Sequence, residues 1–231
     1  MKAERRRPLL LDLFCGAGGA AMGYYRAGFD VVGVDITPQP RYPFKFIEAN
    51  ALDFLKALAF YRIQTFGFYL EEFDVIHASP PCQAYSAGAR MRNGYAKDHP
   101  RLIEPIREQL RKSGLPYIIE NVPGAPLINP MFLCGSSFGL DVRRHRGFEC
   151  NRAIFVPECS HFLQKIIVGV YGDHPEDSVI RKGHPAIRAK DIQHAKQVMG
   201  IDWTDDWLEI KEAIPPAYTE YVGKQLMEYL R

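Results

Sequence analysis

The chain has 231 residues, of which 47% are hydrophobic and 24% are charged. This length and composition fit one mid-sized α/β domain with a substantial core, and they exclude disordered, collagen-like and low-complexity proteins. The 29 Lys and Arg residues against 27 Asp and Glu residues give a formal net charge of +2, which neither requires nor excludes a nucleic-acid partner.

The first residues and the cysteines bear on the cellular compartment. Residues 1–11 are basic and then only briefly apolar, which does not fit a signal peptide. No apolar run approaches the roughly 18 residues that a membrane span needs. The cysteines are Cys15, Cys82, Cys134, Cys150 and Cys159. Their odd number and the absence of close pairing favour free thiols in a reducing compartment, so we expect a cytoplasmic protein without membrane contact.

Short apolar runs alternate with helical patterns over the first half of the chain. The runs predict strands at 9–14, 31–34, 44–47, 73–78 and 117–119. The segments between them predict helices at 20–27, 51–61 and 101–112. Strands that alternate with helices indicate a parallel, doubly wound α/β sheet.

The pattern is weaker beyond residue 123. Residues 143–150 are basic and then strand-like, and residues 166–171 predict one further strand. Helical spacing returns at 189–199, 206–212 and 215–231. We find no internal repeat and no linker that would separate two independent domains.

The glycines at residues 16–19 follow the first predicted strand and precede a helix. Backbone N–H groups and a helix N-terminus can then face a ligand. Asp35, at the end of the next strand, can accept both hydroxyls of a ribose. The pattern also matches a dinucleotide-binding loop, so a nicotinamide enzyme, a methyltransferase and a tight structural turn all remain open.

Ser-Pro-Pro-Cys-Gln, residues 79–83, comes directly after the strand predicted at 73–78. Open α/β sheets bind ligands at this carboxyl edge, and two prolines fix where the next side chain points. Cys82 is therefore a candidate nucleophile. The alternative is a buried cysteine that acts as a small hydrophobic residue.

Glu120 follows the strand predicted at 117–119, on the same sheet edge as Cys82. A carboxyl group in a partly apolar pocket has a raised pKa and can donate a proton to a ring nitrogen, although a capping or ion-paired acid is the alternative. The alternation of Arg144 and Arg146 predicts two guanidinium groups on one side of a strand, facing a base carbonyl or a phosphate. A solvated basic face is the alternative for these arginines.

Four motifs occur in an order that resembles the DNA cytosine-5 methyltransferases. They are Phe-Cys-Gly-Ala-Gly-Gly at 14–19, Pro-Pro-Cys-Gln-Ala-Tyr-Ser at 80–86, Glu-Asn-Val at 120–122, and Arg144-x-Arg146. The compact layout is most similar to small phage-encoded or prophage-encoded members. The resemblance implies a Rossmann-like, S-adenosylmethionine-dependent methyltransferase fold with a small target-recognition insertion. It divides the chain into a catalytic core at 1–152, a target-recognition region at 153–206 and a returning C-terminal helix at 207–231.

The resemblance also implies how S-adenosylmethionine is held. Phe14 would stack on its adenine, the glycine loop would follow its methionine portion, and Asp35 would bind its ribose. Asn50 stands where the family has an acid for the adenine amino group, and its side-chain carbonyl oxygen is expected to accept instead. The full set of expected cofactor residues is Phe14, Cys15, Gly16, Ala17, Gly19, Asp35, Ile36, Asn50, Ala51 and Pro80.

For catalysis, the resemblance implies that Cys82 attacks C6 of a flipped-out cytosine while Glu120 hydrogen-bonds N3. Asn121 would brace the proline turn, and Arg146 with Arg144 would hold the base O2. Expected substrate-binding residues are Gln83, Ser86, Arg90, Arg92 and Asn121. We expect DNA as the partner and a monomeric enzyme.

The positive charge of the residues that follow Cys82 supports a nucleic-acid partner. The basic residues of this stretch are Arg90, Arg92, Lys97, Arg101, Arg107, Arg111 and Lys112, and a solvated face is the alternative for part of them. Only about residues 160–190 remain to contact bases, which predicts that the recognised DNA sequence is short.

Other functions remain as alternatives. A nicotinamide-dependent oxidoreductase would share the glycine loop but would not need the Cys82 motif. An amino-methyltransferase normally carries an aromatic residue at the position of Cys82. A non-catalytic DNA-binding relative and cytosine-5 methylation of RNA are the further alternatives. A zinc site from Cys150, Cys159 and His161 fits no common finger spacing, so no metal is expected.

Overall fold

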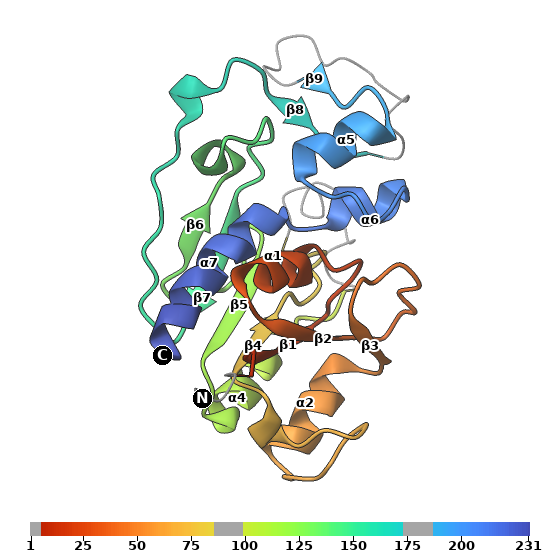
Figure 1. Ribbon diagram of the computed structural model, residues 1–231, viewed down its shortest axis with the longest axis vertical. Coiled ribbons are helices and arrows are strands. Elements are labelled where there is room, and N and C mark those ends of the chain that lie inside the picture. Colours follow the sequence, from red (N-terminus) through yellow and green to blue (C-terminus); the bar gives the residue numbers. More distant parts are fainter. Residues whose placement is uncertain (1–5, 86–98, 173–186) are drawn as a thin grey trace, which may run out of the picture.

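The computed structural model describes residues 6–85, 99–172 and 187–231 and shows a seven-stranded sheet in the order β3-β2-β1-β4-β5-β7-β6 (Figure 1). The first five strands of this order are parallel, whereas β7 is antiparallel to both β5 and β6. The strands are β1 (Leu9–Leu13), β2 (Asp30–Asp35), β3 (Lys45–Glu48), β4 (Val75–Ala78), β5 (Tyr117–Asn121), β6 (Met131–Leu133) and β7 (Arg146–Cys150).

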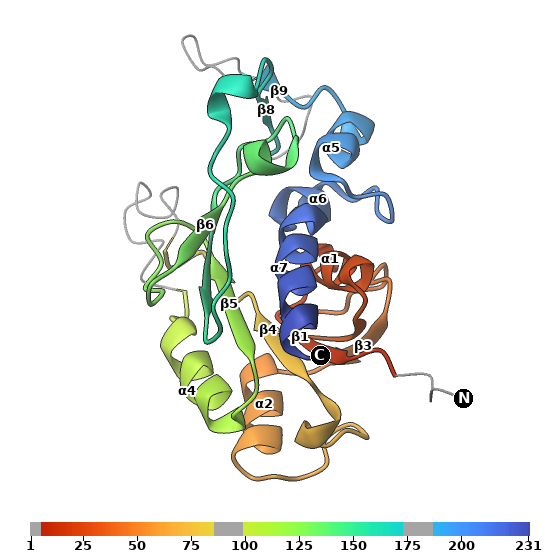
Figure 2. The same ribbon diagram turned by 60° about the vertical axis from the view of Figure 1, so that its left-hand side comes forward.

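Helices cover both faces of the sheet (Figure 2). One face packs against α1 (Gly19–Ala27) and α7 (Pro216–Tyr229), and the other against α2 (Ala51–Ala59) and α4 (Ile103–Ser113). The apolar faces predicted for these helices form two cores, one on each side of the sheet. This arrangement confirms the predicted parallel, doubly wound sheet.

Two glycines of α1 allow it to lie directly against the C-terminal part of the chain. A Cβ atom on Gly23 would lie 2.1 Å from Thr219 Oγ1, and one on Gly19 would lie 2.4 Å from the Ile214 carbonyl oxygen. No side chain fits at these distances. The glycine-rich sequence therefore serves helix packing at Gly19 and Gly23 as well as the loop that precedes α1.

Residues beyond β7 form a smaller third core. It contains the two-residue parallel pair β8 (Val168–Gly169) and β9 (Ile187–Arg188), with α5 (Ile192–Met199) and α6 (Trp207–Glu212). Short 3-10 helices lie at η1 (Leu70–Glu72), η3 (Gly135–Phe138) and η4 (His161–Leu163). Within the described ranges, no helix is both long and apolar enough to cross a membrane.

The sequence-based expectations fail mainly in the part of the chain that follows β5. The strand expected at 166–171 is only two residues long, and β6 was not predicted because its three residues carry no alternating pattern. The expected pairing of Arg144 and Arg146 on one strand is also wrong. β7 begins at Arg146, and Arg144 lies before it with a φ of 21°, so strand alternation does not relate the two side chains.

Candidate active site

The loop between β1 and α1 turns through three residues in the left-handed region. Phe14, Gly16 and Gly18 have φ values of 57°, 47° and 88°. For a bulky residue such as Phe14 this conformation is strained, and such strain is concentrated at functional sites. Among the residues that the structure describes, no atom lies within 4 Å of a Cβ position built on Gly16, so the loop presents an open cradle at this residue.

Asp35, at the end of β2, is fixed next to this loop. Its Oδ2 accepts a hydrogen bond from the Gly16 N–H at 3.0 Å, and its Oδ1 accepts one from the Thr37 N–H at 3.0 Å. A carboxylate has about four acceptor positions, so each oxygen can accept one more hydrogen bond. The neighbouring Ile36 is 66% exposed and leaves an apolar surface beside the carboxylate.

The expectation for Asn50 is not met in this structure. Asn50 is the N-cap of α2, and its Oδ1 accepts from the Leu52 and Asp53 N–H groups at 3.0 and 3.2 Å. Both lone pairs of that oxygen are used in capping the helix, so it is not free to accept from an adenine amino group. Ala51, the first residue of α2, is buried.

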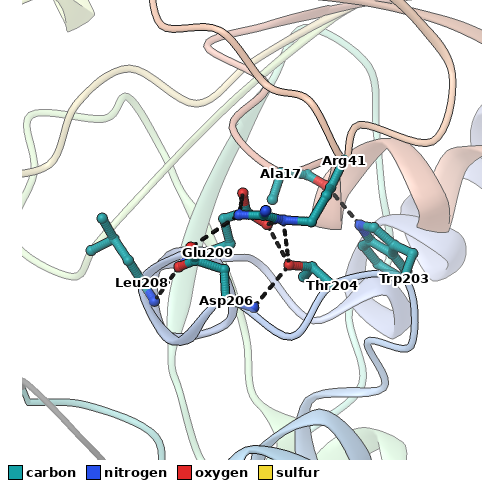
Figure 3. A network of polar contacts seen from close by, with 7 residues as sticks. All are labelled: Ala17, Arg41, Trp203, Thr204, Asp206, Leu208 and Glu209. Atoms are coloured by element: carbon teal, nitrogen blue, oxygen red, sulfur yellow. Dashed lines mark hydrogen bonds and ion pairs between the residues drawn. The ribbon is translucent and has the colours of Figure 1, made fainter.

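Side chains from the C-terminal half support the glycine loop, as Figure 3 shows. Trp203 Nε1 donates a hydrogen bond to the Ala17 carbonyl oxygen at 2.8 Å. Arg41, from the segment between β2 and β3, pairs with Glu209 at 2.6 Å and with Asp206 at 2.9 Å. No sequence pattern indicates these contacts, because the partners are more than 160 residues apart.

Cys82 lies in a turn that follows β4. Asn121, at the end of β5, is buried, and its Nδ2 donates to the Pro80 carbonyl oxygen at 2.7 Å. This is the bracing contact that its position predicts; a contact between Asn121 and substrate stays a prediction. Cys82 is half-buried, and burial raises the pKa of its thiol above the ordinary value, while the positive charge of Arg146 acts in the opposite direction.

Glu120 and Arg146 meet beside this turn. Arg146 Nε lies 3.1 Å from Glu120 Oε1, and both side chains are largely buried. Burial raises the pKa of Glu120, although Arg146 and a hydrogen bond from Ser79 lower it in part. The carboxyl group is therefore easier to protonate than an exposed glutamic acid, as expected from its place at the sheet edge.

A buried hydrogen-bond chain leads to Glu120 from the core. Tyr24 Oη lies 3.0 Å from His77 Nδ1, and His77 Nε2 lies 2.8 Å from Ser79 Oγ. Burial lowers the pKa of His77 to about 3, so its ring is neutral. Ser79 is in turn a hydrogen-bond partner of Glu120, which lowers the pKa of that carboxyl group in part. Tyr24, His77 and Ser79 thus form a buried polar chain next to Glu120, and no role for these three side chains was predicted.

Arg144 has a different environment from Arg146. Its guanidinium group donates to the carbonyl oxygens of Val170, at 3.4 Å, and of Lys211. Burial, together with the charge of Arg146, lowers the pKa of Arg144 to about 9, which leaves it charged at neutral pH. Arg144 therefore joins the second half of the molecule to the site, and Arg146 makes the contact with Glu120.

Several buried polar atoms around this edge have no hydrogen-bond partner within the described part of the chain. Buried polar groups normally have partners, so such atoms indicate where a ligand would bind. Glu120 Oε1 is one of them: Arg146 Nε lies 3.1 Å away as its ion-pair partner but makes no hydrogen bond to it. Asp12 was also not predicted, although a single acidic residue within an apolar run is a signal that could have indicated it. Burial raises the pKa of Asp12 to about 8. The atoms are Asp12 Oδ1, Gln83 Oε1, Glu120 Oε1 and Arg144 Nε.

The residues expected to contact DNA after Cys82, and the other basic residues of this stretch, have different environments. Ser86, Arg90, Arg92 and Lys97 lie outside the described residues. Arg107 is not available to nucleic acid, because its side chain is 1% exposed and pairs with the buried Glu149 at 2.7 Å. Lys112 is exposed but pairs with Glu108 at 2.6 Å. The charge of Arg107 therefore does not contribute to a nucleic-acid surface, and the sequence does not reveal its buried partner on β7.

The sheet order, the glycine loop after β1 and the acid after β2 together define the fold of the S-adenosylmethionine-dependent methyltransferases. Solved structures support this class. A DNA modification methyltransferase encoded within an E. coli prophage superposes with a TM-score of 0.60 at 16% identity, over 96% of this chain and 99% of that one. The S. pombe Dnmt2 methyltransferase superposes with a TM-score of 0.59 at 14% identity, over 98% and 100% of the two chains.

Sequence comparison identifies the family within this class. The family model of the C-5 cytosine-specific DNA methylase matches residues 9–127, which is about half of the chain, and the protein belongs to this family. The type II methyltransferase M.XorII of Xanthomonas oryzae pv. oryzae is 29% identical over 149 residues. That match covers 62% of this chain and 31% of the relative, so the matched segment spans less than a third of the length of M.XorII.

Proposed function

We propose that this protein transfers a methyl group from S-adenosylmethionine to C5 of a cytosine in DNA. The observation that carries the proposal is the meeting of Cys82, Glu120 and Arg146 beside the open glycine loop. A half-buried thiol, a protonatable carboxyl group and a fixed cation are the groups that covalent activation of a cytosine ring requires.

The residues present fit the proposed cofactor. Gly16 leaves an open cradle where a side chain would otherwise lie, and Asp35 retains acceptor positions for ribose hydroxyls. Phe14 is partly buried and offers a ring for stacking at the same loop. When bound there, S-adenosylmethionine supplies an electrophilic methyl group. Asn50 is omitted from this set because its carbonyl oxygen caps α2.

Cys82 begins the proposed reaction. Its thiol loses a proton to water, and the thiolate sulfur then forms a bond to C6 of the cytosine as the C5–C6 double bond opens. Electron density moves through the ring toward N3, where Glu120 in its neutral form donates a proton, so C5 becomes nucleophilic. After C5 has accepted the methyl group, water takes the C5 proton, the C6–S bond breaks to return the Cys82 thiolate, and the N3 proton returns to Glu120, which restores the aromatic ring.

Arg146 has two roles in this scheme. Its charge favours the thiolate form of Cys82, and its ion pair holds Glu120 at the sheet edge. Within the described residues, the buried Nε of Arg144 has no partner, which leaves it available to the base O2 or to a phosphate. The base must leave the duplex to reach this half-buried position. Residues 153–206 would supply the contacts that select the target.

Covalent trapping tests the proposal directly. DNA that contains 5-fluorocytosine is incubated with protein and S-adenosylmethionine, because fluorine cannot leave C5 as a proton and the C6–S adduct persists. We expect a covalent complex with wild type and with Cys150→Ala, and none with Cys82→Ala. A complex that forms only with 5-fluorocytosine RNA would replace the DNA substrate with RNA. Binding of DNA without any complex or methyl transfer would refute the enzyme and favour a non-catalytic relative.

A further inference from the structure

Two cysteines and two histidines from three separate segments meet away from the proposed active site. Cys134 directly follows β6, and His145 directly precedes β7. Cys159 and His161 lie on the irregular segment after β7, where His161 begins η4. The four potential ligand atoms all lie within 4.8 Å of one another.

The distances in this cluster are those of ligands that share one ion. Cys134 Sγ lies 3.3 Å from His161 Nε2, and Cys159 Sγ lies 3.5 Å from His145 Nε2. Zn–S bonds of about 2.3 Å and Zn–N bonds of about 2.0 Å at tetrahedral angles place sulfur and nitrogen about 3.5 Å apart. The two imidazole rings are 5.1 Å apart and nearly perpendicular, so both can direct Nε2 to one point.

We infer that Cys134, His145, Cys159 and His161 form a structural Zn²⁺ site. Two thiolates and two imidazoles in a closed four-ligand set are the donors that zinc takes in structural sites. The set differs from the cysteines and histidine that the sequence suggested, because Cys150 lies on β7 outside the cluster. The spacing of the four residues matches no common zinc finger, so the fold alone brings them together.

Hydrogen bonds already hold the sulfur ligands and their loop in place. Ser136 Oγ donates to Cys134 Sγ at 3.2 Å, and the Ser160 N–H donates to Ser136 Oγ at 3.1 Å. Ser136 therefore connects the ligand after β6 with the ligand pair around Ser160. The Cys134 thiol donates to the Arg143 carbonyl oxygen at 2.9 Å, and binding of zinc would release that proton.

The surroundings show what such an ion would do. The segment 151–167 has little apolar anchorage: Phe155, Phe162 and Leu163 are 80%, 85% and 67% exposed. A metal ion at Cys159 and His161 would fasten this segment to the edge of the main sheet. Since His145 stands between the two arginines of the proposed site, the same ion would fix the backbone that presents Arg146 to Glu120.

The test measures metal content in protein without a polyhistidine tag. Wild type purified from zinc-containing medium under reducing conditions is dialysed and analysed by inductively coupled plasma mass spectrometry. We expect about one zinc per chain. The double variant Cys159→Ser/His161→Gln should lose it, whereas Cys150→Ser and Cys82→Ser should retain it. A chelator should lower the Tm of wild type and leave that of the double variant unchanged.

Cobalt substitution of the wild type tests whether these four residues bind a metal ion even if the double variant fails to fold. Co²⁺ bound by two thiolates and two imidazoles gives the intense visible bands of a tetrahedral site and a sulfur-to-metal charge-transfer band. Both signatures support the site. Wild type that binds neither zinc nor cobalt, that gives octahedral cobalt spectra, or that forms a Cys134–Cys159 disulfide instead would overturn it. Equal zinc in wild type and in a folded double variant would also overturn it.

Discussion

The two halves of this molecule are held together in different ways. In the parallel half, residues 9–121, strands such as β4 are buried along their whole length and lie between helices on both faces. In the second half, strands are two to five residues long, and its irregular segments depend on single polar side chains, as Trp203 does on Ala17, in addition to the pairing of β7 with β5 and the packing of α7 on α1. Main-chain pairing thus positions the reacting groups, and individual polar contacts fix the irregular segments around them.

The largest effect is expected at the reacting end of the parallel half. Glu120→Gln keeps the shape and the hydrogen bonds of the side chain but cannot donate a proton as a carboxylic acid does. The methylation rate should fall by roughly 100-fold to 10,000-fold, measured under saturating cofactor. Cofactor affinity and Tm should change little, and the exposed Glu108→Gln on α4 should behave as wild type. A collapse of cofactor affinity with a normal rate per bound cofactor would make Glu120 a structural residue.

The second-largest effect is expected where α4 of the parallel half contacts β7 of the second half. Arg107 on α4 makes two hydrogen bonds to Glu149 on β7, at 2.7 and 2.8 Å. Arg107→Ala leaves Glu149 buried without its partner, which should lower the free energy of unfolding by about 3–5 kcal/mol. Urea denaturation measures this loss, and the exposed Arg111→Ala on the same helix is the control. Equal stability of the two variants would show that the contact between α4 and β7 does not depend on this ion pair.

The reactivity of Cys82 should depend on pH in a direction set by its surroundings. Because burial raises its pKa above the ordinary value, the thiol stays protonated at neutral pH, and alkylation by iodoacetamide should rise about tenfold per pH unit below that pKa. Arg146→Ala removes the charge that lowers this pKa, so its profile should move to higher pH. Peptide mass spectrometry separates Cys82 from the exposed Cys159. A shift to lower pH would contradict the assigned role of Arg146.

The smallest effect concerns a contact that links the second half to the glycine loop. Trp203→Phe removes the hydrogen bond to the Ala17 carbonyl oxygen while keeping an aromatic ring. We expect a loss of about 0.5–1.5 kcal/mol in cofactor binding, or roughly 2-fold to 13-fold in Kd, by calorimetry with S-adenosylhomocysteine. Trp207→Phe is the matched control, since its Nε1 donates to Gly172 rather than to the loop. Equal affinities of the two variants would show that Trp203 does not support the cofactor loop.

The sequence by itself determined the parallel half and the central pair of the site. Apolar runs encode burial and therefore strands, and the carboxyl ends of parallel strands meet at one edge. For that reason the strand pattern alone predicts Cys82, after β4, and Glu120, at the end of β5, on the same edge of the sheet. Asp35 followed from the same rule at the end of β2.

Tertiary structure alone decided the features that depend on where irregular segments cross. Local spacing suggested that Arg144 and Arg146 share a strand, but β7 begins only at Arg146, and the lack of regular pattern before it hid this boundary. Arg107 looked like a surface cation because its partner Glu149 is 42 residues away. The cluster around Cys134 and His161 has no sequence signature for the same physical reason: periodicity records which face of an element is buried, but not which distant side chain will meet it there.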